Sequence, residues 1–124
     1  MKILAMDDQL LVTFSVQRIL SNRGYTVATA SDGLEGVKLF EQFGPDLVIV
    51  DYQMPKMNGV EVIEYIRTKK MSNIPILILS GSTDEAIKEK GFELGIADYL
   101  AKPVDLHQLV GRVSALFERA KIAI

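Results

Sequence analysis

Apolar residues occur along this chain in two alternating patterns. Five short apolar runs lie at residues 2–6, 26–29, 47–50, 76–79 and 97–101, each bounded by polar residues. Short apolar runs separated by helix-length segments are typical of buried parallel strands. After each run, apolar residues recur at the spacing of an amphipathic helix. This alternation predicts an α/β fold, a doubly wound five-stranded parallel sheet with helices on both faces.

Apolar residues mark both the first and the last helix, and the spacing is clearest in the last. We expect the first helix at residues 9–23, where Gly24 ends it. Its apolar positions are Leu11, Phe14, Val16, Ile19 and Leu20. The last helix has an apolar face formed by Leu106, Leu109, Val110, Val113, Leu116 and Phe117.

The helix after the fourth strand is marked more weakly. Ser82 and Glu85 have the spacing of a capping box, and the helix is expected at residues 84–94. It has few apolar residues and contains Gly91, so we expect it to be the least stable helix.

Composition narrows the class of protein. With 124 residues, 48% of them hydrophobic and 24% charged, the chain has the balance of one globular domain, which we place at residues 1–124. The formal net charge is −2, so the chain lacks the excess of basic residues that is typical of nucleic-acid-binding domains, and we expect no direct nucleic-acid binding. The chain has no cysteine, which excludes disulfide bonds and thiolate metal sites.

The two ends of the chain bear on its expected location. The first residues enter a predicted strand without a cleavable leader, and no apolar stretch reaches the length of a membrane span. We therefore expect a soluble cytoplasmic protein without membrane contact. Residues 121–124 are more apolar than is usual at a free chain end, so a linker to a second domain stays an open alternative.

Charged side chains follow three of the predicted strands. Asp7 and Asp8 follow the first strand, Asp51 the third and Lys102 the fifth. In an open parallel sheet, ligands bind beyond the carboxyl ends of the strands. Carboxylates that lie close together destabilise the fold unless a cation relieves their repulsion. Oxygen ligands without histidine or cysteine favour Mg²⁺ over zinc.

Each of these residues also has a simpler role open to it. Asp8 can be the N-cap of the first helix. Lys102 can neutralise the acids, or it can hold a phosphoryl oxygen as a compact charge. Ser80, at the end of the fourth strand, is of a type common in turns. The whole set, spread over the ends of four strands, is what indicates a site for a divalent cation and a phosphoryl group.

Four segments, at residues 7–8, 51–59, 80–81 and 98–103, resemble the receiver domain of response regulators in two-component signalling. The resemblance covers essentially the whole chain. It implies the flavodoxin-like strand order 2-1-3-4-5, which chemotaxis regulators share.

The resemblance implies roles for the acidic residues. Asp51 would be the phosphoacceptor, and it would take the group from a phosphohistidine on a sensor histidine kinase or a histidine phosphotransfer protein. Asp8, Asp51 and the backbone carbonyl of Gln53 would bind Mg²⁺, with Asp7 acting through water or shared with Asp8.

The resemblance also implies a switch. Lys102 and Ser80 would hold the other phosphoryl oxygens, and the Ser80 hydroxyl would move toward the new group. Tyr99 would then turn inward, although it can equally be a partly buried tyrosine with a hydrogen-bonded hydroxyl. The changed surface, on the fourth helix, fifth strand and fifth helix, would serve a downstream effector protein or an attached output domain.

Three further positions refine this picture. Pro103 matches the cis proline of the family. Gln53 and Ser82 occupy positions that tune hydrolysis of the acyl phosphate. Ser80 stands where related proteins often have threonine, so the switch hydroxyl is kept but a methyl group is lost.

Three other functions fit parts of the sequence. Phosphatases with an aspartyl nucleophile usually carry Asp-x-Asp after the first strand and a cap insertion, and both are missing here. A flavin or nucleotide carrier needs a phosphate-binding loop, and no Gly-x-Gly-x-x-Gly motif occurs. A degenerate receiver would have lost some of the site residues. We therefore expect a phosphoacceptor that assists its own phosphotransfer and dephosphorylation, not a conventional turnover enzyme.

Overall fold

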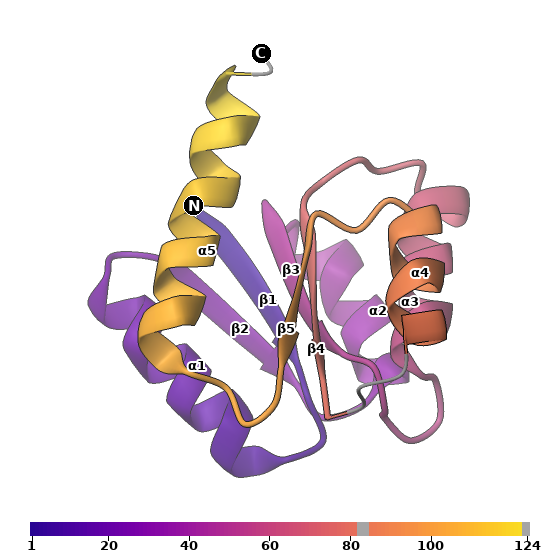
Figure 1. The fold of residues 1–124 in the computed structure, drawn as a ribbon, viewed down its shortest axis with the longest axis horizontal. Coiled ribbons are helices and arrows are strands. Elements are labelled where there is room, and N and C mark those ends of the chain that lie inside the picture. The colour runs from indigo at the N-terminus through magenta and orange to yellow at the C-terminus, as the bar shows by residue number, and fades with distance from the viewer. Residues whose placement is uncertain (82–84, 123–124) are drawn as a thin grey trace.

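The computed structural model describes residues 1–81 and 85–122, with side chains up to residue 120. Five parallel strands form one sheet in the order β2-β1-β3-β4-β5, which confirms the predicted fold (Figure 1). The strands are β1 (Lys2–Met6), β2 (Thr26–Ala30), β3 (Leu47–Asp51), β4 (Ile76–Ser80) and β5 (Asp98–Ala101). The helical segments are α1 (Leu10–Asn22), α2 (Gly33–Phe43), α3 (Gly59–Glu64), η1 (Tyr65–Lys69), α4 (Glu85–Glu93) and α5 (Leu106–Ile122).

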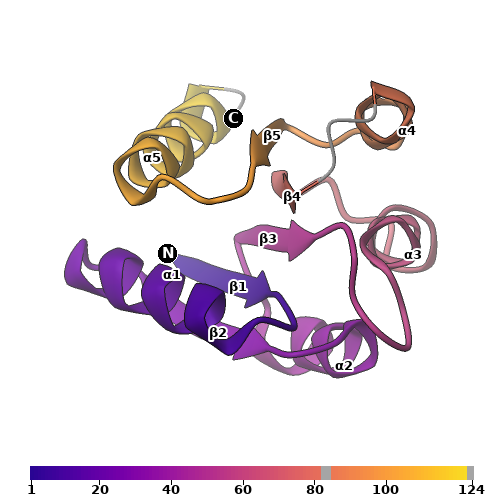
Figure 2. The same ribbon diagram turned by 60° about the horizontal axis from the view of Figure 1, so that its bottom comes forward.

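Helices cover both faces of the sheet. Helices α1 and α5 lie on one face, and α2, α3 and α4 lie on the other (Figure 2). Successive side chains of a strand point to opposite faces of the sheet. In β1, Ile3 and Ala5 pack with α1 and α5, whereas Leu4 and Met6 pack in the core cluster on the other face. Strands β3 and β4 are buried along their whole length, as expected for parallel strands covered on both sides. Polar side chains therefore gather where these strands end.

Helix α1 packs through a face that matches the predicted one only in part, because Val16 and Leu20 are buried and Ile19 packs against the core as expected, but two other residues of the set are not. The sequence places Leu11 and Phe14 in its apolar set, but their exposed fractions are 82% and 62%. The buried residues are Thr13, Val16 and Leu20, which form one stripe at spacings of three and four. The Thr13 hydroxyl donates a 3.1 Å hydrogen bond to a backbone carbonyl one turn earlier, so it can be buried in place of a larger apolar residue.

Smaller differences from the prediction concern the start of one strand, the position of a capping box and one additional helical turn. Strand β5 starts at Asp98, one residue later than predicted. The predicted capping box at Ser82 and Glu85 falls partly outside the described residues, but a capping box does begin α3, between Asn58 and Glu61. The π-helical turn η1, which follows α3 directly, has no counterpart in the prediction. Within the part of the chain that the structure describes, no helix is long and apolar enough to cross a membrane.

Candidate functional site

Three aspartates and a lysine meet at one edge of the sheet. Asp7 directly follows β1, Asp51 ends β3 and Lys102 directly follows β5. Because β1, β3, β4 and β5 pair in parallel, their carboxyl ends open toward the same edge. One carboxylate oxygen from each of Asp7, Asp8 and Asp51 lies within 4.8 Å of the others. The structure thus brings together the acidic residues that the sequence singled out.

Lys102 holds two of these carboxylates together. Its Nζ lies 2.8 Å from Oδ2 of Asp7 and 3.2 Å from Oδ2 of Asp51. The exposed fractions of the side chains are 16% for Lys102, 3% for Asp7 and 5% for Asp51. Nζ also donates a 3.0 Å hydrogen bond to Oε1 of Gln9. Because unpaired charge is costly in so buried a place, the lysine and the two aspartates stabilise one another.

The surroundings raise the pKa of Asp51 from its ordinary value of 3.8 to about 6. Burial is the largest cause, and the negative charge of Asp7 adds to it. Lys102 and the backbone N–H of Gln53, which lies 3.4 Å from Oδ1 of Asp51, lower the pKa without cancelling the rise. The groups around Asp51 therefore compensate the negative charge of its carboxylate only in part.

The pKa of Lys102 is raised above its ordinary value. Burial by itself disfavours the ammonium, but the contacts with Asp7 and Asp51 outweigh burial. Lys102 therefore stays positively charged throughout the neutral range.

The donor set fits a hard divalent cation. Asp7, Asp8 and Asp51 offer three converging oxygen ligands. Oδ2 of Asp7 is buried and accepts no well-aligned hydrogen bond from the described residues, so its approach to Lys102 is an ionic contact. A bound cation would satisfy this oxygen and the charge of Asp51 together. Magnesium typically binds one or two carboxylates and keeps several waters, which suits a site of this size.

Of the residues predicted to form the switch, Ser80 lies at the same edge of the sheet as this cluster, and Tyr99 lies within β5. Ser80 ends β4 and is 1% exposed. Tyr99 lies half-buried in β5, and Nζ of Lys88 is 5.8 Å from the centroid of its ring. The peptide bond between Lys102 and Pro103 is cis, the isomer that the resemblance implies.

A pocket of about 260 Å³ opens at the cluster. It is lined by Asp8, Gln9, Asp51, Gln53, Gly81 and Lys102. Gln53 lies exposed at this pocket, whereas Ser82, the other residue predicted to tune hydrolysis, lies outside the described residues. Gln9 and Gly81 also line the pocket, although neither was among the predicted site residues. The signal for Gln9 was its position directly after the paired aspartates, where the first helix begins.

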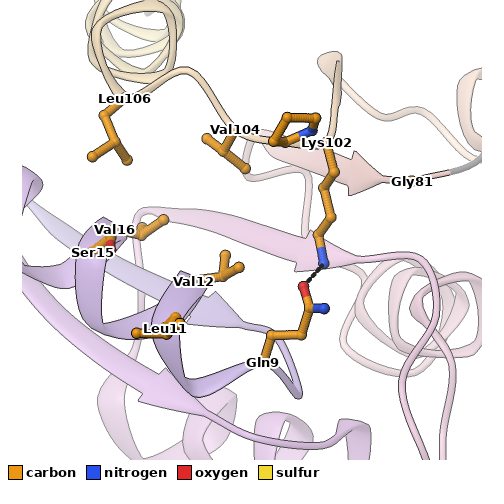
Figure 3. Close-up of a pocket in the computed structure, with 10 residues that line it drawn as sticks. Gln9, Leu11, Val12, Ser15, Val16, Gly81, Lys102, Val104 and Leu106 are labelled. Carbon is orange, nitrogen blue, oxygen red and sulfur yellow. Dashed lines mark hydrogen bonds between the residues drawn. The ribbon is translucent and has the colours of Figure 1, made fainter.

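A second, larger cavity of about 590 Å³ adjoins the first. Apolar side chains of α1 and of the segment after β5 line most of it, among them Val12, Val16 and Val104. Figure 3 shows Gln9 and Lys102 facing each other at one side of this cavity, joined by their hydrogen bond. Both residues line both cavities, so their contact lies where the acidic pocket meets the apolar one.

Comparison with protein families gives a match over most of the chain. The family model of the response regulator receiver domain matches residues 3–114. The alkaline phosphatase synthesis transcriptional regulatory protein PhoP of Bacillus subtilis is 40% identical over 122 residues, which cover 98% of this chain and 50% of that protein. The probable transcriptional regulator ycf27 of Guillardia theta is 41% identical over 122 residues, covering 98% and 47%. The chain spans about half the length of the curated relatives it matches.

Solved structures give the same result. The receiver domain of the Francisella response regulator 1452 superposes with a TM-score of 0.89 at 28% identity, covering 96% of this chain and 98% of that one. The chemotaxis protein CheY4 of Vibrio cholerae gives a TM-score of 0.87 at 31% identity, covering 93% and 97%.

Proposed function

Because the chain belongs to the response regulator receiver domain family, we propose that residues 1–124 form one phosphoacceptor domain and that Asp51 is its acceptor. The contact that best supports this proposal is that of Lys102 with both Asp7 and Asp51, beside three converging carboxylate oxygens. Domains of this family are signalling domains, so the proposed reaction is a single transfer that changes the state of the protein. The proposed phosphoryl donor is a phosphohistidine on a sensor histidine kinase or a histidine phosphotransfer protein, which implies a cytoplasmic location.

In the proposed step, a carboxylate oxygen of Asp51 attacks the phosphorus of the phosphohistidine. The new O–P bond forms as the P–N bond breaks, and the electron pair returns to the imidazole nitrogen, which takes up a proton. The products are an aspartyl phosphate and a neutral histidine. Attack requires ionised Asp51, and its pKa of about 6 leaves most of it ionised at neutral pH.

We propose Mg²⁺ as the metal of this site. Asp8, Asp51 and the backbone carbonyl of Gln53 would bind it, with Asp7 acting through water or shared with Asp8. When bound, the metal offsets negative charge on the transferring group. Lys102 would hold a phosphoryl oxygen, and the 3.2 Å contact of its Nζ with Asp51 supports this role. The charge of Lys102 is maintained by the same contacts that raise its pKa.

The proposed output follows from the added charge. The phosphoryl group carries about −1.5 to −2 charges at neutral pH, in place of the single negative charge of the Asp51 carboxylate. Ser80, buried at the end of β4, offers a hydroxyl to the new oxygens, and Tyr99 on the neighbouring strand would turn inward in response. This would change the surface of α4, β5 and α5 for a downstream effector protein or an attached output domain. Gln53 and Ser82 would set how fast water removes the phosphoryl group.

Intact-mass measurement tests the proposal. The protein is incubated with a small acyl-phosphate donor, with and without Mg²⁺. Wild type should gain the mass of one phosphoryl group only when Mg²⁺ is present, and Asp51→Asn should gain none. Glu64→Gln is the matched control, because Glu64 is an exposed carboxylate at the end of α3 and outside the acidic pocket. Phosphorylation of Asp51→Asn at the wild-type rate would refute the assignment.

A further inference from the structure

The side chain of Gln9 lies at the mouth of the acidic pocket, where it accepts a hydrogen bond from Lys102. Oε1 of Gln9 is 3.0 Å from Nζ of Lys102, although the two residues are 93 positions apart in the sequence. In Figure 3, Gln9 reaches up from the beginning of α1 and Lys102 reaches down from the end of β5 to meet it. This contact lies beside Asp51, because Gln9, Lys102 and Asp51 line the same pocket.

Gln9 does not use its side chain to cap its helix. It is the N-cap residue of α1, yet its side chain makes no capping hydrogen bond. At the beginnings of α2 and α3, the side chains of Asp32 and Asn58 accept capping hydrogen bonds of 2.8 Å and 3.0 Å. The backbone N–H of Gln9 instead donates to Oδ1 of Asp7 at 2.9 Å. A side-chain substitution at position 9 therefore leaves the backbone contact of α1 in place.

The contact completes the surroundings of the Lys102 ammonium. The ammonium donates a hydrogen bond to Gln9 at 3.0 Å and makes ionic contacts with Asp7 at 2.8 Å and Asp51 at 3.2 Å. Asp7 and Asp51 are buried carboxylates, whereas Gln9 is an exposed neutral amide at the pocket mouth. The amide therefore gives the ammonium a hydrogen-bond partner at the pocket mouth, in addition to its contacts with the two carboxylates.

We propose that Gln9 is a positioning residue for phosphoryl transfer: it holds the Lys102 ammonium at the pocket, where a phosphoryl oxygen arriving at Asp51 meets it. The inference rests on the proposed function. A neutral amide binds the ammonium more weakly than a carboxylate does, so it yields an N–H to the charged phosphoryl group without opposing it. Gln9 acts through Lys102 and forms no bond to the reacting atoms.

The substitution Gln9→Met tests the inference, because methionine has a similar length but no amide oxygen. We expect it to slow phosphorylation by the acyl-phosphate donor, at saturating Mg²⁺, by roughly ten-fold, the factor that one hydrogen bond to a charged group carries. Gln108→Met is the matched control, since Gln108 is exposed in the first turn of α5 and outside the pocket. It should react at the wild-type rate.

A second readout needs neither metal nor donor. In metal-free protein, the ¹H–¹⁵N signal of the Lys102 ammonium reports its hydrogen bonds through protection from exchange with water. We expect faster exchange in Gln9→Met, and wild-type protection in Gln9→Glu, which restores an acceptor oxygen of the same reach. A purely structural role for Gln9 would lower thermal stability but would not produce this pattern.

The outcomes separate the two claims. If wild type gains no phosphoryl group, the proposed function fails and this inference fails with it. If wild type is phosphorylated but Gln9→Met reacts equally fast, or Lys102 exchanges at the wild-type rate in Gln9→Met, only the role of Gln9 is overturned. Slower phosphorylation together with a less protected ammonium supports it.

Discussion

Nζ of Lys102 lies 3.2 Å from Oδ2 of Asp51, yet the pKa of Asp51 is still raised to about 6. Burial and the charge of Asp7 therefore outweigh the lysine. The protein alone gives the cluster fewer positive charges than negative ones. This imbalance is what a divalent cation would correct, and it makes the stability of the metal-free protein sensitive to Asp51.

The substitution Asp51→Asn should stabilise the metal-free protein at neutral pH. The pKa of Asp51 in the folded state, about 6, exceeds its ordinary value of 3.8. The folded state therefore binds more protons between these values, and the resulting stability is lost as the pH rises through about 6. This difference in pKa corresponds to about 3 kcal/mol. Because Lys102 also loses one charged partner, we expect a net gain of about 1–3 kcal/mol in the free energy of unfolding.

Urea unfolding in the presence of a chelator measures this gain. The advantage of Asp51→Asn should shrink when the pH is lowered from about 7 to about 5, because wild-type Asp51 then takes up its proton. Added Mg²⁺ should also shrink the gain by binding the wild-type protein. An advantage that is the same at both pH values would show that ionisation of Asp51 is not its cause.

Removing the ammonium of Lys102 should have the opposite effect. Lys102→Met leaves Asp7 and Asp51 facing each other without the cation between them, so we expect a loss of about 3 kcal/mol in the metal-free protein. Mg²⁺ should restore part of this stability, because it can take over the neutralising role. Thermal unfolding with and without Mg²⁺ checks both expectations.

Lys56→Met is the control for that experiment. Lys56 also pairs with an aspartate, Asp32, at 3.5 Å, but 62% of its side chain is exposed. An exposed ion pair contributes about 0–1 kcal/mol, so this variant should unfold near the wild-type temperature and should not respond differently to Mg²⁺. Equal losses from both substitutions would contradict a special role for the buried pair.

Gly59 is required by the backbone that supports Asp51. A Cβ at position 59 would lie 2.6 Å from the carbonyl oxygen of Asp51 and 2.9 Å from Cα of Tyr52, and neither atom can move aside as a flexible side chain could. We expect Gly59→Ala to destabilise the protein by about 2–4 kcal/mol. Gly111→Ala, in α5, meets nothing within 4 Å and should stabilise it by about 0.5–1 kcal/mol through helix propensity. Chemical unfolding of both variants tests this contrast in sign.

The hydroxyl of Ser80 should connect phosphorylation to Tyr99. In Ser80→Ala, we expect phosphorylation of Asp51 to continue, slowed by about ten-fold for one lost hydrogen bond to a charged group. The response of Tyr99 to phosphorylation should be lost, because nothing draws the end of β4 toward the phosphoryl oxygens. Fluorine NMR of protein labelled with fluorotyrosine measures that response. A Tyr99 signal that shifts equally in wild type and Ser80→Ala would remove Ser80 from the switch.

The fold class and the gathering of the acidic residues could be predicted because both follow from strand ends, whereas the strand order was implied by the resemblance to receiver domains. A strand ends where its apolar run gives way to a polar residue. Parallel pairing then brings Asp7 and Asp51 to the same edge of the sheet. The roles given to these residues remain predictions.

Side-chain direction and local helix geometry could not be predicted. Leu11 and Phe14 fit an apolar pattern, yet the register of α1 on the sheet buries Thr13 in their place. The hydrogen bond between Gln9 and Lys102 joins distant segments, and nothing near either residue in the sequence indicates it. Such contacts depend on how the finished elements pack against one another, and local pattern carries little information about that.

Locating the phosphoryl group on the chain tests the central claim most directly. Borohydride reduces an aspartyl phosphate to homoserine, and peptide mass spectrometry then identifies the modified position. After reaction with the acyl-phosphate donor and Mg²⁺, we predict homoserine at position 51 in wild type and no reduced residue in protein that was not treated with the donor. Reduction at Asp7 or Asp8 with position 51 unchanged, or a phosphoryl group on a hydroxyl side chain, would contradict the account.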